Sequence, residues 1–511
     1  MERRPSLSNR AGGILLHPTS LPGPHGIGDL GSSARRFAEL LAAAGQSWWQ
    51  MLPIHPPAAA HSPYAAFSVF AGSPLLISLD RLAEEGWLEP ADLVPPKGLP
   101  RDRVNYPQAQ RFKEARLEKA FGTFEKNASS IDRERLEAFA AANVFWLPDY
   151  ALFCALKEAH QGAPWVEWEG ALRLRQPEAL AQARRKLDVR LRFHIFVQHQ
   201  FSRQWSELRD HCRKFGLGLL GDVPIYAAHD SAEVWAKPQL FSLDGDGRLT
   251  MMAGVPPDYF SKTGQLWGNP LYRWDVHRQG GYEWWVYRLR VTFDRFDAVR
   301  LDHFIGFQRY WEIPAGSRTA QGGRWVDGPG ADLFDRARDV LGSLEIAAED
   351  LGAATPEVFA LRDRCGFPGL RVLQFAFGGD SCTNDHLPHR YPRRCVVYTG
   401  THDNETTAAW FRRLPPKERR WVSRYAGTDG REIHWDMIRL AWMSPADVAI
   451  APAQDLLGLG SGARMNLPGT VRGNWRWRLT DAALTAPIAR RLRALTEIYG
   501  RIPGLSRAAP N

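Results

Sequence analysis

Short apolar runs that end in polar residues alternate along this chain with longer amphipathic stretches. Such alternation is typical of parallel strands joined by crossover helices. The runs that fit a strand lie at 13–20, 48–54, 216–226, 296–304, 343–352, 369–377, 395–403 and 446–457. Eight parallel strands can close into a (β/α)8 barrel, the TIM barrel, so the pattern predicts an α/β protein with this fold.

The long interval between the second and third predicted strands is rich in helix-forming residues. It contains RFKEARLEKAFGTFEK (111–126) and a second helical pattern over 177–216. We therefore expect a large, mainly helical insertion subdomain over residues 55–215, on the rim of a single barrel domain that spans residues 1–511. Further loop insertions are expected at the C-terminal face of the barrel.

The bulk composition narrows the class of protein. A chain of 511 residues with 44% hydrophobic content can bury a large core. The net charge is +9, but Lys and Arg are interleaved with Asp and Glu, so we expect a solvated surface and no nucleic-acid partner. The apolar run GILL near the N-terminus is too short for a signal-peptide core, and no stretch reaches transmembrane length, so we expect no membrane association.

Cysteine and tryptophan usage adds two expectations. The five cysteines are an odd number, scattered and without a CxxC pair, which favours free thiols in a reducing cytoplasm. Among the 20 tryptophans, clusters such as GYEWWVYRLR and GNWRWRL bring indoles next to polar donors. Aromatic faces stack on sugar rings, but they also fill cores, and most of these indoles are expected to be structural.

Polar side chains stand where most of the predicted strands end. These residues are Asp222, Asp302, Glu349, His402, Asp403, Gln454 and Asp455. The C-terminal ends of barrel strands converge on one mouth, where active sites are found, so carboxylates distant in sequence are expected to become neighbours. Acidic residues also favour the turns after strands, but this number of them, with His and Arg companions, favours a site.

Three of these carboxylates fit the cleavage of a glycosidic bond. Retaining cleavage needs a nucleophilic carboxylate and a proton-donating carboxyl about 5 Å apart. Arg300 lies two residues before Asp302 in an extended chain and therefore faces the same way, so it would keep Asp302 ionised. Glu349 follows an apolar strand, and desolvation would raise its pKa. A plain salt bridge at a strand end is the alternative for the arginine and its partner.

The remaining carboxylate and two imidazoles fit substrate contacts. Asp403 could hold sugar hydroxyls as the ring flattens in the transition state, while His402 and His303 donate hydrogen bonds. HLPH at 386–389 is more typical of loop packing than of a zinc site, and neither an HExxH motif nor a calcium loop is present. We therefore expect neither a metal nor a cofactor.

The segments VRLDHF, AEDLG and YTGTHDN resemble those of amylomaltase, the 4-alpha-glucanotransferase or disproportionating enzyme family (glycoside hydrolase family 77), which is related to the alpha-amylases. The resemblance covers nearly the whole chain. Further matching segments, in the family's order, are GILLHPTSLPGPHGIGDLG, SPYAAFSVFAGSPLLI, GDVPIYAAHDSAEVW, GVPPDYFSKTGQLWGNPLYRW, RYWEIPAG, VLQFAF, HLPHRY, AQDLLGLG and RMNLPGT.

The resemblance implies a role for each matching residue. It implies Asp302 as nucleophile, Glu349 as general acid and base, and Asp403 as transition-state stabiliser. The subsite for the glycosyl unit would be lined by Arg300, His303, His402 and Asp222. Further sugars would be contacted from three segments. An active-site lid loop over 250–275 would contribute Asp258, Gln265 and Trp267, the SPY motif would contribute Tyr64 and Ser62, and the C-terminal segment would contribute Asn466.

Three positions depart from the family's pattern. AAAH (58–61) stands where a Gly-Tyr-Gly type of turn is usual, Ser73 replaces an Asn, and Ile305 stands where an Arg is common. None of them is one of the three carboxylates. The expected reaction class therefore stands, while acceptor preference is left open.

Transfer and hydrolysis share one glycosyl-enzyme ester, and spacing in the sequence does not decide between them. The resemblance implies transfer of a 1,4-α-D-glucan segment to the 4-OH of an acceptor glucose or glucan, through a covalent intermediate on Asp302. Malto-oligosaccharides and 1,4-α-glucans would be both donors and acceptors. The alternatives are a hydrolytic alpha-glucosidase or amylase with the same carboxylates and a noncatalytic α-glucan-binding protein.

Overall fold

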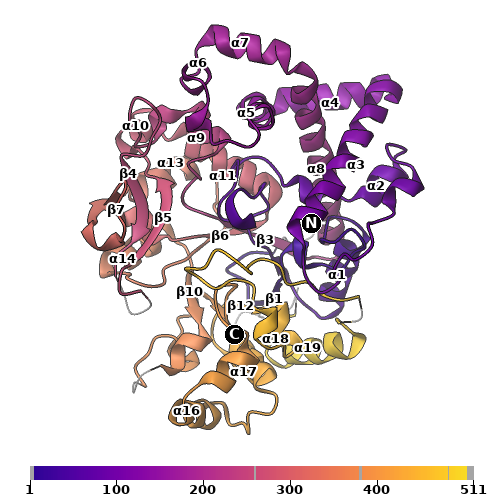
Figure 1. Ribbon diagram of the computed structural model, residues 1–511. Helices are drawn as coiled ribbons and strands as arrows, with labels where there is room; N and C mark the ends of the chain where they lie inside the picture. Colours follow the sequence, from indigo (N-terminus) through magenta and orange to yellow (C-terminus); the bar gives the residue numbers. More distant parts are fainter. Residues whose placement is uncertain (1–4, 258–260, 379–381, 482, 503–511) are drawn as a thin grey trace.

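Eight parallel strands form a closed barrel at the centre of the molecule. The structure is a computed structural model, and it describes residues 5–257, 261–378, 382–481 and 483–502 (Figure 1). Around the barrel the order is β1-β12-β11-β10-β9-β6-β3-β2. The strands are β1 (Ala11–Leu15), β2 (Trp48–Gln50), β3 (Gly218–Val223), β6 (Ala298–Leu301), β9 (Ile346–Ala348), β10 (Gly369–Val372), β11 (Cys395–Tyr398) and β12 (Val448–Pro452). The predicted (β/α)8 fold is confirmed.

The two faces of the barrel wall carry two separate hydrophobic clusters. Leu219, Ile346 and Val397 pack outward with the surrounding helices. Their strand neighbours, among them Leu220 and Ala347, belong to the cluster that fills the barrel. Because side chains alternate along a strand, the positions two residues beyond the inward-facing ones also face inward. This alternation decides which polar side chains reach the mouth.

The chain between β2 and β3 is mainly helical, as predicted, and forms the upper part of Figure 1. Its α-helices are α2 (Leu79–Glu84), α3 (Tyr106–Asn127), α4 (Ser130–Ala142), α5 (Leu147–Ala159), α6 (Gly170–Arg173), α7 (Pro177–Lys186) and α8 (Asp188–Lys214). Helix α8 contacts α3, α4, α5 and α7, and it leads directly into β3. The rings of Phe296 and Trp205 of α8 pack edge to face, with centroids 5.2 Å apart, which joins the insertion to the segment before β6.

A small antiparallel sheet in the order β5-β4-β7-β8 lies beside the barrel. Its strands are β4 (Met251–Val255), β5 (Gln265–Pro270), β7 (Arg309–Pro314) and β8 (Arg324–Asp327). The segment expected as a lid loop, 250–275, therefore contains two paired strands. A Cβ at Gly254 would come within 2.2 Å of the Gln265 carbonyl oxygen, and Gly264 has a φ of +70°. The glycines that suggested a loop are needed for close strand contact and for the turn.

The other helices surround the barrel and its mouth. They are α1 (Ser32–Ala43), α9 (Ala232–Ala236), α10 (Trp274–Gln279), α11 (Glu283–Arg295), α12 (Ile305–Gln308), α13 (Ala331–Leu341), α14 (Pro356–Cys365), α15 (Thr407–Arg413), α16 (Pro416–Ala426), α17 (Ile433–Met443), α18 (Ala453–Leu456) and α19 (Ala486–Ile498). Within the described ranges no single helix has the length and apolar character to cross a membrane. Helices α4 and α5 meet that test only as a pair, with a bend of 100° between them.

A buried arginine near the C-terminus holds the seam where the first and last barrel strands pair. Arg501 is fully buried, and its guanidinium donates to the carbonyl oxygens of Ala11 and Asp447 at 2.9 Å each. It donates as well to carbonyls at the end of α17 and in the turn that follows, including those of Trp442 and Ala446. Hydrogen bonds to a charged group contribute more than neutral ones, so this residue fixes the C-terminal segment against the barrel.

Candidate active site

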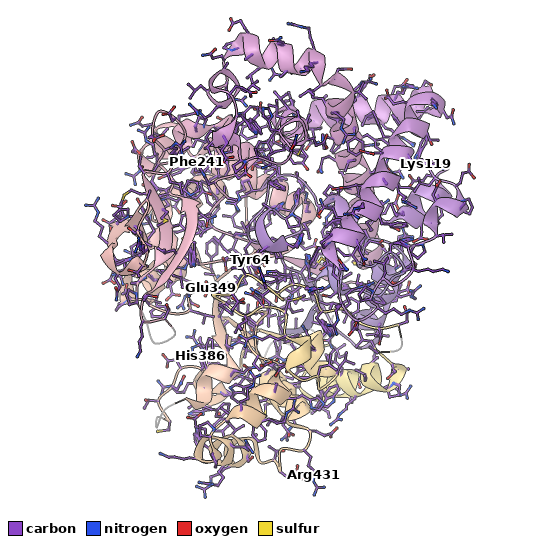
Figure 2. The ribbon with its side chains drawn as sticks, in the orientation of Figure 1. Tyr64, Lys119, Phe241, Glu349, His386 and Arg431 are labelled. Carbon is purple, nitrogen blue, oxygen red and sulfur yellow. The ribbon has the colours of Figure 1, made fainter. Side chains whose placement is uncertain are left out.

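Four ionisable side chains enter the barrel mouth from β3, β6 and β9. Asp222 lies in β3 and Arg300 in β6, while Asp302 and Glu349 directly follow β6 and β9. Each stands two residues beyond an inward-facing position, so the strand period turns all four toward the same opening. Figure 2 shows Tyr64 and Glu349 near the centre of the molecule, where segments distant in sequence meet.

Arg300 holds two carboxylates at once. One guanidinium nitrogen, Nη1, donates to both oxygens of Asp222 at 2.8 Å, and Nη2 lies 2.7 Å from Oδ1 of Asp302. The Tyr64 hydroxyl donates to Oδ2 of Asp222 at 2.8 Å. Burial raises the pKa of Asp222 to about 7, although the Arg300 charge acts against the rise. The arginine is buried, so its charge acts on Asp302 with little screening from water.

Glu349 has the environment of a proton donor. Burial raises its pKa to about 8; the Arg300 charge opposes the rise and the Asp302 charge adds to it. The backbone N–H of His303 donates to Oε2 of Glu349 at 2.7 Å, and His303 has a φ of +48°. Because that nitrogen is bonded to the carbonyl carbon of Asp302, standard geometry puts Oε2 within about 5 Å of the Asp302 Cα. The two carboxyl groups therefore stand on adjacent parts of one mouth.

His303 offers an unused polar atom at this mouth. Its Nε2 is buried and has no hydrogen-bond partner within the described residues. Burial lowers the pKa of His303 to about 4, although the Asp302 charge opposes the shift, so the imidazole is neutral at pH 7. Buried polar atoms are nearly always paired, so an unpaired one at a mouth is suited to a ligand that carries hydroxyl groups.

Asp403 approaches from the loop that follows β11. Oδ1 of Asp403 accepts a hydrogen bond from Nδ2 of Asn466 at 2.6 Å and lies 3.3 Å from Nε2 of His402. The ring of Tyr64 stacks on His402, with centroids 5.1 Å apart. Burial lowers the pKa of His402, while Asp403 opposes the change. Tyr64, which also binds Asp222, thus connects this loop to the strand carboxylates.

The hairpin of β4 and β5 brings an exposed indole to the mouth. Trp267 is 36% exposed. Its ring packs edge to face with the ring of His303, with centroids 4.8 Å apart. Nε1 of Trp267 donates to Oε1 of Gln265 at 3.2 Å, which orients the indole. Both residues lie in β5. Asp258, the third residue expected from this segment, lies outside the described residues.

Other expected residues lie apart from the carboxylate cluster. Ser62 accepts a hydrogen bond from the backbone N–H of Tyr64 at 3.3 Å, so its contact is local to the SPY motif. Gln454 and Asp455, expected at the mouth from their place after a strand, lie buried in α18. The Asp455 carboxylate accepts hydrogen bonds from Thr399 and from the backbone and side chain of Thr407. These hydrogen bonds join α18 to the base of the loop that follows β11.

Two residues at the mouth were not identified as site residues from the sequence, although each lies in a segment noted there. Trp475 is buried against Tyr64 and His402, with ring centroids 5.8 and 5.9 Å away, and Arg464 donates to the backbone of Asp403. Both belong to an irregular C-terminal segment without periodicity. The cluster GNWRWRL contains Trp475, but its pattern does not separate this indole from a core residue.

The described residues contain no group of three or more His, Cys, Asp or Glu side chains that could hold a metal ion. In the HLPH segment, Nδ1 of His386 accepts from the backbone of Val372, and His389 contacts the Tyr425 hydroxyl at 2.9 Å. These histidines pack the loop, as expected.

Comparisons with known proteins agree on one family. The sequence model described as 4-alpha-glucanotransferase matches residues 16–485. The 4-alpha-glucanotransferase of Thermus thermophilus is 49% identical over 501 residues, covering 96% of this chain and 99% of that protein. That of Synechocystis is 48% identical, covering 97% and 99%. A solved structure, the amylomaltase from Streptococcus agalactiae in complex with acarbose, is 37% identical with a TM-score of 0.94, covering 96% of this chain and 99% of that one.

Proposed function

Because this chain belongs to the 4-alpha-glucanotransferase family, the glycosyltransferases that act on 1,4-α-glucans, we propose that its barrel mouth performs the transfer by retaining double displacement. A segment of a donor glucan is passed to the 4-OH of an acceptor glucose or glucan. Malto-oligosaccharides serve as donor and acceptor. The hydrolytic and noncatalytic alternatives are not favoured, since the relatives are named as transferases.

In the first step, a carboxylate oxygen of Asp302 attacks the anomeric carbon of the donor. The bond from that carbon to the glycosidic oxygen breaks, and Glu349 gives its proton to the departing oxygen. In the second step the acceptor 4-OH attacks the same carbon, Glu349 takes the hydroxyl proton back, and the ester to Asp302 is broken. The product keeps the α configuration because the carbon is inverted twice.

The contrast between Asp302 and Glu349 carries this assignment. Asp302 faces the Arg300 guanidinium at 2.7 Å, which favours a charged nucleophile. Glu349 has a pKa of about 8, chiefly because of burial, and therefore keeps its proton at pH 7. A carboxyl paired with an arginine and, on the neighbouring strand, a carboxyl that keeps its proton are what the first step requires.

We propose that Asp403 stabilises the oxocarbenium-like transition state through sugar hydroxyls. Asn466 donates to this carboxylate and His402 lies beside it, which supports a fixed orientation. Arg300, Asp222, His402 and His303 line the subsite of the transferred unit. Further sugars on either side would contact Tyr64, Ser62, Asp258, Gln265, Trp267 and Asn466. The unpaired Nε2 of His303 supports a hydrogen bond to substrate.

We propose that residues 250–275 act as the lid that favours a sugar acceptor over water. The indole of Trp267 supports this role, because it is partly exposed and packs against His303, the residue that follows Asp302. Excluding water lengthens the life of the ester until an acceptor hydroxyl arrives. Residues 55–215 form the helical subdomain of a single catalytic domain that spans the chain.

We further propose a cytoplasmic location. The support is the state of the cysteines: Cys154, Cys212, Cys365, Cys382 and Cys395 are all free thiols, which suits a reducing compartment.

Incubation of the purified protein with maltotriose tests the proposal. Transfer yields glucose and longer oligomers while the number of reducing ends stays constant. A rising number of reducing ends would show hydrolysis, and binding without products would show a noncatalytic role. Either outcome would contradict the proposed reaction.

A further inference from the structure

An arginine outside the carboxylate cluster holds the loop that carries Asp403. We propose that Arg464 is a positioning residue for glucan transfer, acting through the backbone of Asp403 and the adjacent Asn466. The proposal rests on the stabilising role proposed above for Asp403. Arg464 need not touch the sugar, since its contacts are with the two segments that present these side chains.

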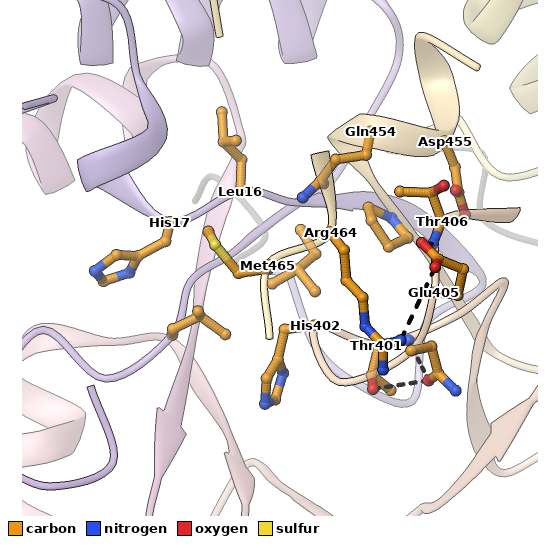
Figure 3. Close-up of a pocket in the computed structure, with 14 residues that line it drawn as sticks. Leu16, His17, Thr401, His402, Glu405, Thr406, Gln454, Asp455, Arg464 and Met465 are labelled. Carbon is orange, nitrogen blue, oxygen red and sulfur yellow. Dashed lines mark hydrogen bonds and ion pairs between the residues drawn. The ribbon is translucent and has the colours of Figure 1, made fainter. Parts of the chain in front are cut away.

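The guanidinium of Arg464 spans two segments far apart in sequence. Nη2 donates to the carbonyl oxygen of Asp403 at 2.6 Å, and Nε donates to the carbonyl oxygen of Asn466 at 2.7 Å. Nη1 lies 4.0 Å from Oε2 of Glu405, a contact drawn as a dashed line in Figure 3. One rigid, planar group therefore fixes the distance between the loop after β11 and the C-terminal segment.

Asn466 completes the connection in the opposite direction. Its backbone N–H donates to the carbonyl oxygen of His402 at 3.1 Å, and its side chain donates to the Asp403 carboxylate at 2.6 Å. Arg464 thus fixes the backbone positions of Asp403 and Asn466, and the Asn466 side chain orients the Asp403 carboxylate. If the guanidinium is lost, the two segments are free to separate and the Asp403 oxygen shifts relative to the sugar.

Hydrogen bonds matter here because side-chain packing behind the loop is incomplete. Figure 3 shows a cavity between the loop and the first and last barrel strands, with Arg464 crossing its wall. Its lining includes His17, Leu52, Thr401, His402, Gln454 and Met465. The polar contacts of Arg464 therefore hold the loop together with the rings of Tyr64 and Trp475, which pack on His402.

Glu405 links the Arg464 guanidinium to α15, because its carboxylate interacts with Arg464 and with Arg413 of that helix. The Glu405 side chain is 9% exposed, and Oε2 also pairs with Arg413 of α15 at 2.5 Å. The Arg464 side chain is 20% exposed, so this charge interaction is only partly screened by water. A lysine would keep the charge, but its single ammonium group would not reproduce the fork that binds both carbonyl oxygens.

The test compares Arg464→Gln and Arg464→Lys with Arg476→Gln. Arg476 lines the outer groove beside Arg464, but its Nε donates to the carbonyl of Val104 and not to the loop. In maltotriose transfer we expect Arg464→Gln to lower kcat by roughly 10- to 100-fold with a smaller change in KM, since displacements near 1 Å cost about that much. Arg464→Lys should recover part of the loss, and Arg476→Gln should stay within about twofold of the native protein.

A double-mutant cycle distinguishes positioning from a structural role. In the background of Asp403→Asn, the effect of Arg464→Gln should largely disappear, because the carboxylate through which Arg464 acts is already gone. Equal losses in both backgrounds would overturn the proposal, as would an unchanged kcat in Arg464→Gln. So would a loss explained by the unfolded fraction at the assay temperature, measured by thermal denaturation.

The same cycle separates this inference from the proposed function. If Asp403→Asn alone keeps full transfer, the role assigned to Asp403 fails and the inference fails with it. If Asp403→Asn is severely impaired while Arg464→Gln is not, only the inference fails.

Discussion

Replacing Glu349 by Gln tests whether this carboxyl carries a proton in the folded protein. Its pKa rises from 4.5 to about 8, mainly through burial. Below pH 4.5 the group is protonated in folded and unfolded chains alike, and it makes no difference to stability. As the pH rises from 4.5 to about 8, the carboxyl loses its proton in the unfolded chain and keeps it in the folded chain. The native carboxyl therefore destabilises the fold by about 3 kcal/mol at pH 7.

Gln does not ionise and can still accept the hydrogen bond from the His303 backbone. We therefore expect Glu349→Gln to raise the free energy of unfolding by about 2–3 kcal/mol at pH 7 and to change it little at pH 4. Denaturant titrations across this pH range measure the difference. Glu345→Gln, at the other end of the same strand segment, is the matched control, because its carboxylate binds Ser6 and Leu7 away from the mouth. A difference that does not grow with pH would refute the reasoning.

Activity gives a second, independent reading of the same substitution. Without a proton donor, kcat for maltotriose transfer should fall by about 10²- to 10⁴-fold. A maltosyl fluoride needs no proton on its leaving group, so the variant should still release one equivalent of fluoride in a burst, seen with an ion electrode. The ester would then persist, because no base removes the acceptor proton. Equal losses with both donors would contradict the acid role.

Three further predictions concern the nucleophile, the lid and the C-terminal segment. Asp302→Asn should abolish transfer with an unchanged circular dichroism spectrum, because an amide does not form the ester; normal turnover would exclude Asp302 as nucleophile. Trp267→Ala should raise the share of ester that reacts with water several-fold, read as new reducing ends per glucose released; an unchanged ratio would remove the lid argument. Arg501→Met should lower the free energy of unfolding by at least about 3 kcal/mol, because several buried carbonyls lose their donors. Denaturant titration at pH 7 measures this change, and an unchanged midpoint would contradict the prediction.

The strands of the barrel were predictable because each is a short apolar run buried on both sides. Their ends were not: the run at 369–377 is mostly apolar on both sides of Val372, yet β10 ends at that residue and a 3-10 helix follows. The antiparallel sheet was missed because its hairpin contains the glycines and prolines that ordinarily mark loops. A glycine is needed at position 254 because two backbones approach closely there, and the sequence does not distinguish this need from that of a turn.

Site residues were predictable where strand geometry alone decides their place. Asp302 and Glu349 each stand two residues beyond an inward-facing position, so the alternation of side chains along a strand was sufficient to predict that they face the mouth. Asp455 follows a strand as well, but Thr399 and Thr407 bind its carboxylate in the interior, and only the three-dimensional arrangement reveals them. Arg464 stands in an irregular segment, and its effect on Asp403 depends on contacts across sixty residues of chain.

The seam between β1 and β12 has a consequence for how the protein is made. Strand β1 leaves the ribosome early, yet one of its edges stays without a partner until residues 448–452 have been synthesised. Arg501, which donates to the Ala11 carbonyl at that edge, is synthesised later still. Ring closure, and with it the complete mouth, therefore requires the last barrel strand, and a nascent chain exposes an unpaired strand edge until residues 448–452 are available.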